Sequence, residues 1–425
     1  MIEKFINQYY MDLIVGAGIS GLSFAMYDKG REYKILEGSD AIGGYCKTTT
    51  RNGFVWDYSG HFFHFQDKDI EEMIMRDMTA NDLVEPVKNT KIKYKDRYVE
   101  YPFQKNIHQL PKEELIDCLY DLFNNGQKEY GNFKEMLYAK FGASIAEKFL
   151  IPYNTKLYAC DLNRLDKEAM GRFFPYAEKE DIIKNFKSGN NLSYNATFVY
   201  PKQGAFEYVK SVVAYLDQTK IELNSHVVSI DINNKLARTK DGRVFSYDRL
   251  ISTLPFPCLL DLCGIEYDKS IYSWNQVLVF NIGFDSKGPV DEFHWIYFPE
   301  GKYVFYRVGF YDNILSQDRT SVYVEIGFKG DEEINPNMYF GRVLKDMMAA
   351  GLIREDQTVV DYESIIMNPA YVHITEASIK DVQEKKAKLA QYDVYSIGRY
   401  GSWTYCSIED NIKEARQLSS IINKK

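Results

Sequence analysis

Three glycines close to the N-terminus, Gly16, Gly18 and Gly21, have the spacing GxGxxG. In this pattern the first glycine makes a tight turn, the second lets a pyrophosphate approach the backbone, and the third lets a helix lie close to a strand. The free N–H groups at the start of that helix then face the phosphates. Glu37 follows 21 residues after Gly16 and is placed to accept a hydrogen bond from a ribose hydroxyl. These four residues predict a dinucleotide-binding site.

The same stretch of sequence contains the elements that must position these residues. Residues 11–30, "MDLIVGAGISGLSFAMYDKG", are typical of a buried strand, a glycine turn and a helix. Residues 33–38, "YKILEG", predict a second strand that ends at Glu37. Two strands joined by a helix indicate a Rossmann-like α/β unit.

The residues that follow favour FAD as the dinucleotide. Gly43, Gly44 and Lys47 are similar to the second fingerprint of the amine oxidase and protoporphyrinogen oxidase group, where a glycine pair passes the FAD and a basic side chain reaches it. Residues 246–255, "SYDRLISTLP", resemble the strand that re-enters the Rossmann core in that group. Residues 226–230, which include Val228, resemble the strand whose backbone meets the adenine. FAD is therefore preferred over NAD, although "STLP" also fits an ordinary strand end.

A glycine-rich aromatic stretch near the C-terminus, residues 398–415, runs into a helix. In the same group of flavoproteins the last loop and helix fold back onto the N-terminal part, and the helix N-terminus faces the flavin. Residues 407–411 carry capping-type side chains that suit this helix start. The cofactor contacts that the resemblance implies are Gly16, Gly18, Ser20, Gly21, Glu37, Gly43, Gly44, Lys47, Gly60, His61, Val228, Gly398, Arg399, Ile408 and Glu409.

The chain also resembles the UDP-galactopyranose mutase family, particularly its longer eukaryotic type, through stretches spread from residue 16 to 412. Residues 53–65, "GFVWDYSGHFFHF", are similar to the motif GF-x-x-D-x-G-G-H, which implies that His61 lies beside the flavin N5. Ser59 stands where that family usually has glycine. The other stretches that carry the resemblance are residues 101–111, 152–161, 171–172, 195–201, 295–310 and 398–405.

The resemblance implies which residues act on the substrate. Arginine offers planar, bidentate donors that suit a diphosphate, and aromatic rings with a polar atom suit a flat base. Each arginine taken singly also fits a surface ion pair. The implied catalytic residues are His61, Arg172, Arg307 and Arg399. The implied substrate contacts are Tyr101, Phe103, Gln104, Asn154, Tyr158, Asn195, Tyr297, Arg307 and Tyr405.

The activity that this resemblance implies is an FAD-dependent sugar-nucleotide mutase. It would interconvert UDP-galactopyranose and UDP-galactofuranose, or a related nucleotide sugar, by attack of N5 of reduced flavin on the anomeric carbon, with NAD(P)H as a candidate reductant. Residues 368–381 replace the family's Y-P-x-P-T segment, with Tyr371 as a candidate substitute, and residues 201–209 lack its glycine-rich run. The sugar and the nucleotide therefore stay open. The alternatives are an amine oxidase-like or protoporphyrinogen oxidase-like oxidoreductase and a non-catalytic FAD-binding protein.

Composition and charge exclude several other classes of protein. The net charge of −8 gives no general basic field for nucleic acid. The six cysteines have no CxxC pair and no metal-ligand spacing, so we expect no metal site. No uninterrupted run of apolar residues approaches the length of a membrane span, and we recognise no signal peptide. We therefore expect a cytoplasmic protein, and an oligomer is compatible with the sequence.

The texture of the sequence changes along the chain and predicts its organisation. Residues 67–83 and 107–185 have helical periodicity, residues 197–255 resemble strands and turns, and residues 276–330 alternate aromatic and polar residues as strands do. The expected fold class is α/β: a Rossmann-like FAD-binding domain, a mixed-sheet substrate domain and an inserted helical domain. The expected limits are 11–100 for the first FAD-binding part, 101–190 for the helical insert, 191–265 for the sheet return, 266–385 for the mixed sheet and 386–425 for the C-terminal FAD-binding part.

Overall fold

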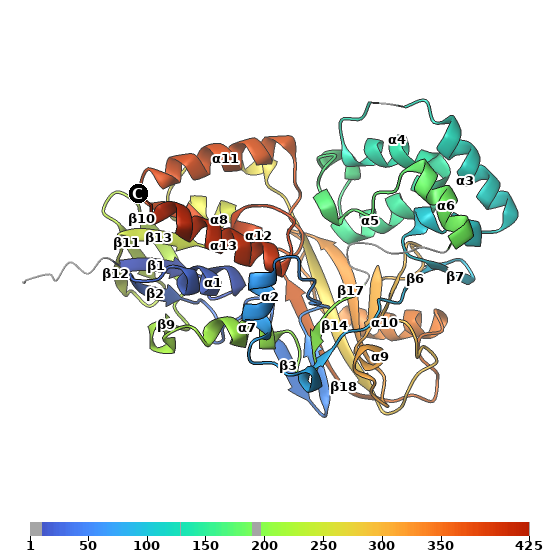
Figure 1. Cartoon of the computed structure of the whole chain (residues 1–425), viewed down its shortest axis with the longest axis horizontal. Coiled ribbons are helices and arrows are strands. Elements are labelled where there is room, and N and C mark those ends of the chain that lie inside the picture. Colours follow the sequence, from blue (N-terminus) through green and yellow to red (C-terminus); the bar gives the residue numbers. More distant parts are fainter. Residues whose placement is uncertain (1–10, 128, 189–196, 425) are drawn as a thin grey trace, which may run out of the picture.

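A five-stranded parallel sheet holds the glycine-rich turn in this computed structural model, which describes residues 11–127, 129–188 and 197–424 (Figure 1). Its strand order is β19-β13-β1-β2-β9, and every neighbouring pair is parallel. The strands are β1 (Met11–Val15), β2 (Glu32–Leu36), β9 (Ile221–Glu222), β13 (Arg249–Ser252) and β19 (Val394–Ser396). The sheet confirms the predicted Rossmann-like unit and the return of residues 249–252 to it.

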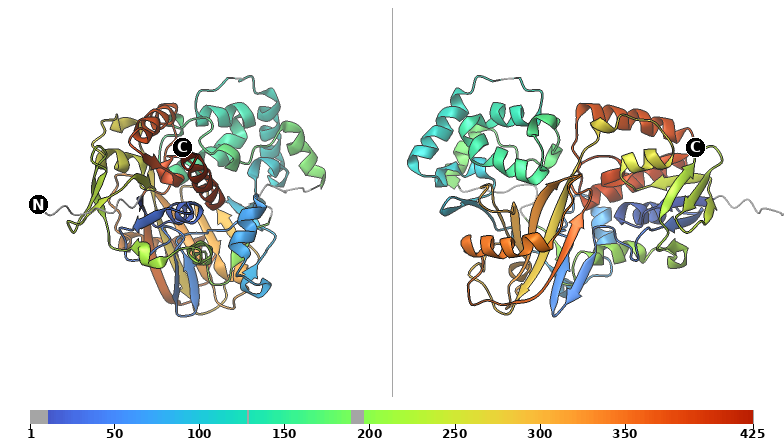
Figure 2. Two further views of the ribbon diagram at one scale, coloured as in Figure 1. Left: turned by 60° about the vertical axis from the view of Figure 1, so that its left-hand side comes forward. Right: turned by 180° about the vertical axis from the view of Figure 1, so that it is seen from behind.

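Helices from both ends of the chain cover this sheet. In α1 (Ile19–Tyr27) the residues from Ile19 to Met26 are all buried, so the helix must be covered on every side. The C-terminal helix α13 (Ile408–Ile422) and α7 (Phe206–Val213) both contact α1. Figures 1 and 2 show α13, in dark red, alongside α1, in blue. The predicted return of the C-terminus to the N-terminal unit is confirmed.

A seven-stranded sheet of order β18-β14-β17-β16-β15-β6-β7 forms the second layer. Its strands are β6 (Thr90–Tyr94), β7 (Arg97–Glu100), β14 (Asn275–Phe284), β15 (Trp295–Tyr297), β16 (Arg307–Phe310), β17 (Ser321–Lys329) and β18 (Val359–Met367). The pair β6 and β15 is parallel and the others are antiparallel, so the sheet is mixed, as expected. The hairpin at residues 90–100, which we assigned with the FAD-binding part at 11–100, belongs to this sheet instead because its strand β6 pairs with β15.

Four α-helices in the described residues 112–127 and 129–188 form the helical part, drawn in teal and green in Figure 1. They are α3 (Lys112–Asn124), α4 (Phe133–Ile145), α5 (Ile151–Tyr158) and α6 (Lys179–Ser188). Helix α5 contacts strand β17. A Cβ at Gly327 of β17 would lie 2.2 Å from the carbonyl oxygen of Lys156, so glycine is what permits this close approach.

Smaller elements complete the fold. They are β3 (Thr48–Arg51), β4 (Phe54–Asp57), α2 (Lys68–Met75), β5 (Leu83–Val84), β8 (Tyr200–Pro201), β10 (Val227–Asp231), β11 (Leu236–Thr239), β12 (Val244–Ser246), α8 (Phe256–Leu262), α9 (Tyr311–Leu315), α10 (Asn337–Ala349), α11 (Glu376–Ala390) and α12 (Gly398–Gly401). Strands β10, β11 and β12 form the predicted meander. No helix in the described ranges is both long and apolar enough to cross a membrane.

Two stretches of secondary structure differ from the sequence-based expectation. The helix expected over 67–83 ends at Met75, because Thr79 and Asp82 form a capping box that starts a separate short turn. The expected strand and turn region after 197 contains helix α7 instead. Its buried residues Tyr208, Val209 and Val212 have helical spacing, which the surrounding strand-like residues obscure.

A buried carboxylate, Asp57, joins the segment before His61 to the rest of the fold. Asp57 has no exposed surface and accepts hydrogen bonds from the hydroxyl of Tyr200 at 2.8 Å, the amide of Ala205 at 3.0 Å and the hydroxyl of Thr48. Burial raises the pKa of Asp57 from its ordinary value of 3.8 to about 6, despite these hydrogen bonds. The pKa of Asp57 is higher in the folded protein than in the unfolded chain, so the protonated carboxyl stabilises the fold. This contribution is present below about pH 4 and is lost as the pH rises through 6.

We expect this titration to be visible in Asp57→Asn. The free energy of unfolding of the wild type, minus that of the variant, should fall by about 2–3 kcal/mol between pH 4 and pH 7, since two pKa units correspond to that energy. Urea titrations at several pH values measure the difference. The exposed Asp231, whose pKa is lowered by hydrogen bonds from Asn234, provides a control in Asp231→Asn that should not show this fall. A wild-type-minus-Asp57→Asn difference that stays flat would contradict the prediction.

Candidate active site

The glycine turn forms a cradle that side chains would fill. Gly16 has φ +105°, and a Cβ there would lie 2.2 Å from the Thr253 hydroxyl oxygen. A Cβ at Gly21 would lie 2.1 Å from the carbonyl oxygen of Gly16. Gly18 forms a bridge with Gly43, and a Cβ on Gly44 would lie 3.3 Å from the Gly18 Cα. The structure therefore brings the two glycine fingerprints together, and no side chain separates the backbones of Gly18, Gly43 and Gly44.

The acidic residue at the end of β2 is fixed by this turn. Glu37 accepts a hydrogen bond from the Ala17 amide at 2.7 Å with one carboxylate oxygen and from the Ser39 amide at 2.9 Å with the other. Lys47 donates to the Ser39 hydroxyl at 3.2 Å. Val228 lies on β10 and is 41% exposed, so it can border a ligand there. These residues fit the ribose and adenine end of a dinucleotide.

The C-terminal loop is bound to the same helix. Gly398 has φ +90°, and a Cβ there would lie 2.6 Å from the Ser20 hydroxyl oxygen. The side-chain oxygen of Asn411 accepts hydrogen bonds from the Ser20 hydroxyl at 2.9 Å and from the Arg399 amide at 2.8 Å. One side chain of α13 thus holds α1 and the glycine loop together.

Two carboxylates, those of Glu409 and Asp410, lie in the first turn of α13. Ser407 and Asp410 form a capping box at its first turn. Glu409, which is buried, accepts hydrogen bonds from the backbone amides of Gln66 at 2.7 Å and Asp67 at 2.8 Å. The implied cofactor contacts Ile408 and Glu409 therefore lie at this helix start, next to the segment that follows His61.

His61 is neutral in this environment. Burial, together with the positive charges of Arg399 and Arg307, lowers the pKa of His61 to about 4, against the raising effect of the hydrogen bond to Ser59. Its Nδ1 lies 3.1 Å from the carbonyl oxygen of Ser59. Since a carbonyl oxygen only accepts, Nδ1 carries the proton and Nε2 is left as an acceptor. Gly60, beside it, is bordered by Phe62 and Tyr323.

Arg307 is held by a buried carboxylate. Its Nε and Nη2 each donate to Glu325 at 2.6 Å, a bidentate pair across the antiparallel strands β16 and β17. Glu325 is 1% exposed and also accepts a hydrogen bond from the hydroxyl of Ser59. Against the raising effect of burial, the positive charge of Arg307 lowers the pKa of Tyr297 and Tyr371, and it also lowers that of His61. Arg307 is therefore a fixed cation among tyrosines.

Arg399 lies against a second group of aromatic rings. Its Cζ is 4.5 Å from the ring centre of Tyr405 and 5.2 Å from that of Tyr371, and these two rings are stacked at 5.7 Å. Its Nη1 donates to the carbonyl oxygen of Cys406 at 3.0 Å. The residue proposed from the divergent 368–381 segment, Tyr371, is thus placed with Arg399 and Tyr405.

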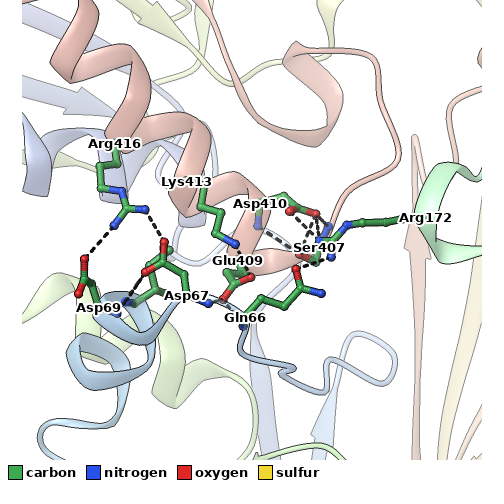
Figure 3. A network of polar contacts seen from close by, with 10 residues as sticks. Gln66, Asp67, Asp69, Arg172, Ser407, Glu409, Asp410, Lys413 and Arg416 are labelled. Carbon is green, nitrogen blue, oxygen red and sulfur yellow. Dashed lines mark hydrogen bonds and ion pairs between the residues drawn. The ribbon is translucent and has the colours of Figure 1, made fainter. Parts of the chain in front are cut away.

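Arg172 lies at the start of α13. It donates to both carboxylate oxygens of Asp410 at 2.7 Å and to the side chain of Gln66 at 2.8 Å, as Figure 3 shows. Its side chain is 39% exposed. It borders a pocket with Phe62, Phe173 and the first residues of α13. The capping carboxylate of α13 therefore holds Arg172 at the helix start, next to the Cys406 carbonyl that Arg399 binds. A catalytic role for Arg172 stays a prediction.

The aromatic residues expected at the base differ in their burial. The ring centres of Tyr101 and Tyr297 lie 5.0 Å apart, and Tyr153, which sequence reasoning missed, lies 5.1 Å from Tyr297. Phe103 has no exposed surface and stacks on Phe149 at 5.2 Å, so the structure places it in the core instead of at a ligand surface. A phenylalanine in a motif carries no signal that separates packing from stacking on a ligand.

Three of the expected substrate contacts have unused hydrogen-bonding atoms. Gln104, Asn154 and Tyr158 are each at most 2% exposed. The carbonyl oxygens of the Gln104 and Asn154 side chains and the hydroxyl of Tyr158 have no hydrogen-bond partner in the described ranges. Buried polar atoms without partners are uncommon, so these atoms fit a polar ligand. Asn195 lies outside the described residues.

Two charged residues at the site were missed by sequence reasoning. Glu325 lies within the strand-like stretch "SVYVEIGF", where a carboxylate at an inward position was the available signal. Lys156 donates to backbone carbonyls between residues 298 and 305, including Phe298 at 2.8 Å and Tyr303 at 3.0 Å. Burial lowers its pKa to about 7. Lys156 thus ties α5, with Asn154 and Tyr158, to the loop that precedes Arg307.

The residues present fit a flavin dinucleotide. The glycine cradle, the fixed carboxylate of Glu37 and the helix start at Ile408 provide groups that suit a pyrophosphate and a ribose. Within the described ranges, no group of three or more His, Cys, Asp or Glu side chains is arranged to hold a metal.

Comparisons with known proteins agree with this arrangement. The family model described as flavin containing amine oxidoreductase matches residues 19–313. The crystal structure of reduced UDP-galactopyranose mutase is similar, with a TM-score of 0.89 and 24% identity over 98% of this chain and 94% of that chain. A protein from Exiguobacterium sp. 255-15, proposed to be a protoporphyrinogen oxidase, has a TM-score of 0.77 at 15% identity over 97% and 98% of the two chains. Cyclohexylamine oxidase from Brevibacterium oxydans IH-35A has a TM-score of 0.69 at 12% identity over 98% and 99%.

At these identities the solved structures define the fold, and the family model defines the membership because it matches more than half of the chain. Both agree with the predicted α/β flavoenzyme fold. The chain belongs to the flavin containing amine oxidoreductase family, and its cofactor is a flavin.

Proposed function

We propose that this flavoenzyme binds FAD and acts as a sugar-nucleotide mutase, interconverting UDP-galactopyranose and UDP-galactofuranose or a related pair of nucleotide sugars. The observation that carries the proposal is the position of two cations, Arg307 and Arg399. Both lie close enough to His61 and Tyr371 for their charges to lower the pKa of each. A diphosphate leaving group requires such fixed, planar donors. The structural similarity to reduced UDP-galactopyranose mutase supports it.

Each residue of the site would have a separate role in such a reaction. When bound, reduced FAD supplies the nucleophilic nitrogen for the anomeric carbon. Arg307 and Arg399 would stabilise the negative charge of the departing diphosphate. The Tyr101 and Tyr297 rings would hold the base, and the unused side-chain oxygen of Asn154 would accept a hydrogen bond from the substrate. His61, kept neutral, would orient the flavin edge without adding a charge.

The test is an assay of the purified holoprotein. After reduction with dithionite, it should convert UDP-galactofuranose to UDP-galactopyranose, and chromatography of the nucleotide sugars measures the conversion. The oxidised protein, assayed without dithionite, serves as the control. Failure to convert any of several UDP-sugars under reducing conditions would contradict the proposal.

An oxidase is the second candidate, and the family description and the similarity to cyclohexylamine oxidase favour it. It would consume oxygen with an amine or another apolar substrate. The half-buried Arg307 and Arg399 argue against an apolar substrate funnel, because a charged wall disfavours an apolar ligand. Oxygen consumption with amines, measured beside the mutase assay, separates the two.

The remaining assignments complete the proposal. We propose a UDP-sugar as the partner molecule, NAD(P)H as the reductant and the cytoplasm as the location. We also propose three functional parts: an FAD-binding part around the parallel sheet, a substrate part on the mixed sheet and a helical part at residues 112–188 that contributes Asn154 and Tyr158. Arg172 would act from the start of α13, where Asp410 holds it.

A further inference from the structure

Ser59 has a backbone conformation that favours glycine. Its φ is +99°, whereas the other described residues besides glycine with positive φ have values between 49° and 57°. Those values lie in the left-handed region that side chains tolerate, and +99° lies beyond it. Ser59 is also 6% exposed, so no contact with solvent explains a hydroxyl there. A strained serine in a buried position indicates that its side chain has a role.

The hydroxyl of Ser59 contacts both members of the ion pair between Arg307 and Glu325. It donates a hydrogen bond to the carboxylate of Glu325, and the Nη2 of Arg307 lies 3.5 Å from the same hydroxyl oxygen. The carboxylate of Glu325 is bonded by Arg307 through two nitrogens at 2.6 Å. With the hydroxyl in place, Glu325 is bonded from two directions and cannot turn without losing one of them.

The backbone of Ser59 connects the same pair to the histidine. Its carbonyl oxygen accepts the hydrogen bond from Nδ1 of His61 at 3.1 Å. A continuous series of contacts therefore runs from His61 through Ser59 and Glu325 to Arg307. The two groups proposed to face the flavin and the diphosphate are fixed to one residue.

We propose that Ser59 is a positioning residue that sets the direction of Arg307 through Glu325 and couples it to His61. The inference rests on the proposed function for the ligand that Arg307 meets. It does not depend on that function for the contacts themselves. The hydroxyl is the working group, and the strained φ is the condition for placing it between Glu325 and Arg307.

Ser59→Gly separates this role from a structural one. Glycine adopts a φ of +99° without strain, so the holoprotein should melt at the same temperature as the wild type or higher. The loss of the hydroxyl frees Glu325, so the dissociation constant for UDP should rise by at least about threefold, as loss of one hydrogen bond to a charged group supports. Isothermal titration with UDP and thermal denaturation measure the two effects. UDP affinity equal to that of the wild type overturns the proposal.

Two further variants serve as controls. Ser59→Ala keeps the strain and loses the hydroxyl, so it should weaken UDP binding as much as Ser59→Gly and melt at a lower temperature. If only the alanine variant lost affinity, strain and not the hydroxyl would be responsible, and the proposal would be wrong. Ser144→Ala removes a hydroxyl that donates to Asp121 at 2.6 Å in the helical part, and it should leave UDP affinity unchanged.

A second measurement separates failure of this inference from failure of the proposed function. If the wild type does not bind UDP, the mutase assignment falls, and the reduction potential of the bound flavin then tests Ser59. A threefold change in the flavin's redox equilibrium in Ser59→Gly, about 14 mV for a two-electron couple, is expected because the coupled groups His61 and Arg307 shift. The change should have the same sign in Arg307→Met. An unchanged potential in Ser59→Gly would then overturn the proposal.

Discussion

Arg307→Ala should lose at least about 1.5 kcal/mol of UDP binding free energy, or roughly a tenfold rise in the dissociation constant, because charge-assisted hydrogen bonds to the diphosphate disappear. It should also lower the free energy of unfolding by about 3–5 kcal/mol, because Glu325, which is 1% exposed, is left as an unpaired buried charge. Calorimetric titration with UDP and urea unfolding measure the two losses.

A double variant distinguishes these two effects. Arg307→Met combined with Glu325→Gln removes the unpaired charge, so stability should return toward the wild-type value while UDP binding stays weak. Arg354→Ala is the matched control for loss of an arginine pair, since Arg354 bonds Asp356 on the surface. It should change stability by less than about 1 kcal/mol and leave UDP affinity as it is. UDP affinity that survives in Arg307→Ala would remove the phosphate role of Arg307.

Gly21→Ala should yield a protein without flavin that is less stable by about 3 kcal/mol or more. The added Cβ would lie 2.1 Å from the carbonyl oxygen of Gly16, and a backbone atom cannot move aside without lifting α1 from the turn. The visible absorbance of the purified protein reports the flavin, and thermal denaturation in the presence of added FAD reports stability.

Gly341→Ala is the control for this substitution. Gly341 is also a helical glycine, in α10, but a Cβ there would meet no atom within 4 Å. Alanine at that site should raise the free energy of unfolding by about 0.5–1 kcal/mol through its better helix propensity, and the protein should keep its colour. A yellow Gly21→Ala protein of wild-type stability would show that the close approach of helix and turn is not required.

The glycine site and the first two strands of the parallel sheet could be predicted from the sequence because the reasons for them are local. The positive φ of Gly16 belongs to the turn itself, and the carbonyl oxygen that excludes a side chain at Gly21 is that of Gly16, five residues earlier. The strand, turn and helix that surround them follow from the hydrophobic pattern of the same stretch. The fold of residues 11–37 is therefore written in a single segment of the chain.

Resemblance extended the prediction to distant segments without giving their contacts. It placed the C-terminal loop on the N-terminal helix, and Asn411 makes that contact through Ser20. It also implied three active-site arginines without giving the partner of any of them. The hydrogen bonds of Arg172 to Asp410 depend on where the start of α13 lies relative to residue 172, and no local pattern records that distance.

The sequence by itself determined that a flavin-type dinucleotide site lies at the N-terminal glycines and that the last helix returns to it. Only the tertiary structure decided which groups surround the reaction centre. Arg307 meets Glu325 because β16 and β17 pair in one particular register, and Ser59 reaches that pair because its backbone adopts a conformation unusual for serine. Strand register and packing across separate segments join residues far apart in the chain, so their partners follow from the folded arrangement and not from neighbouring residues.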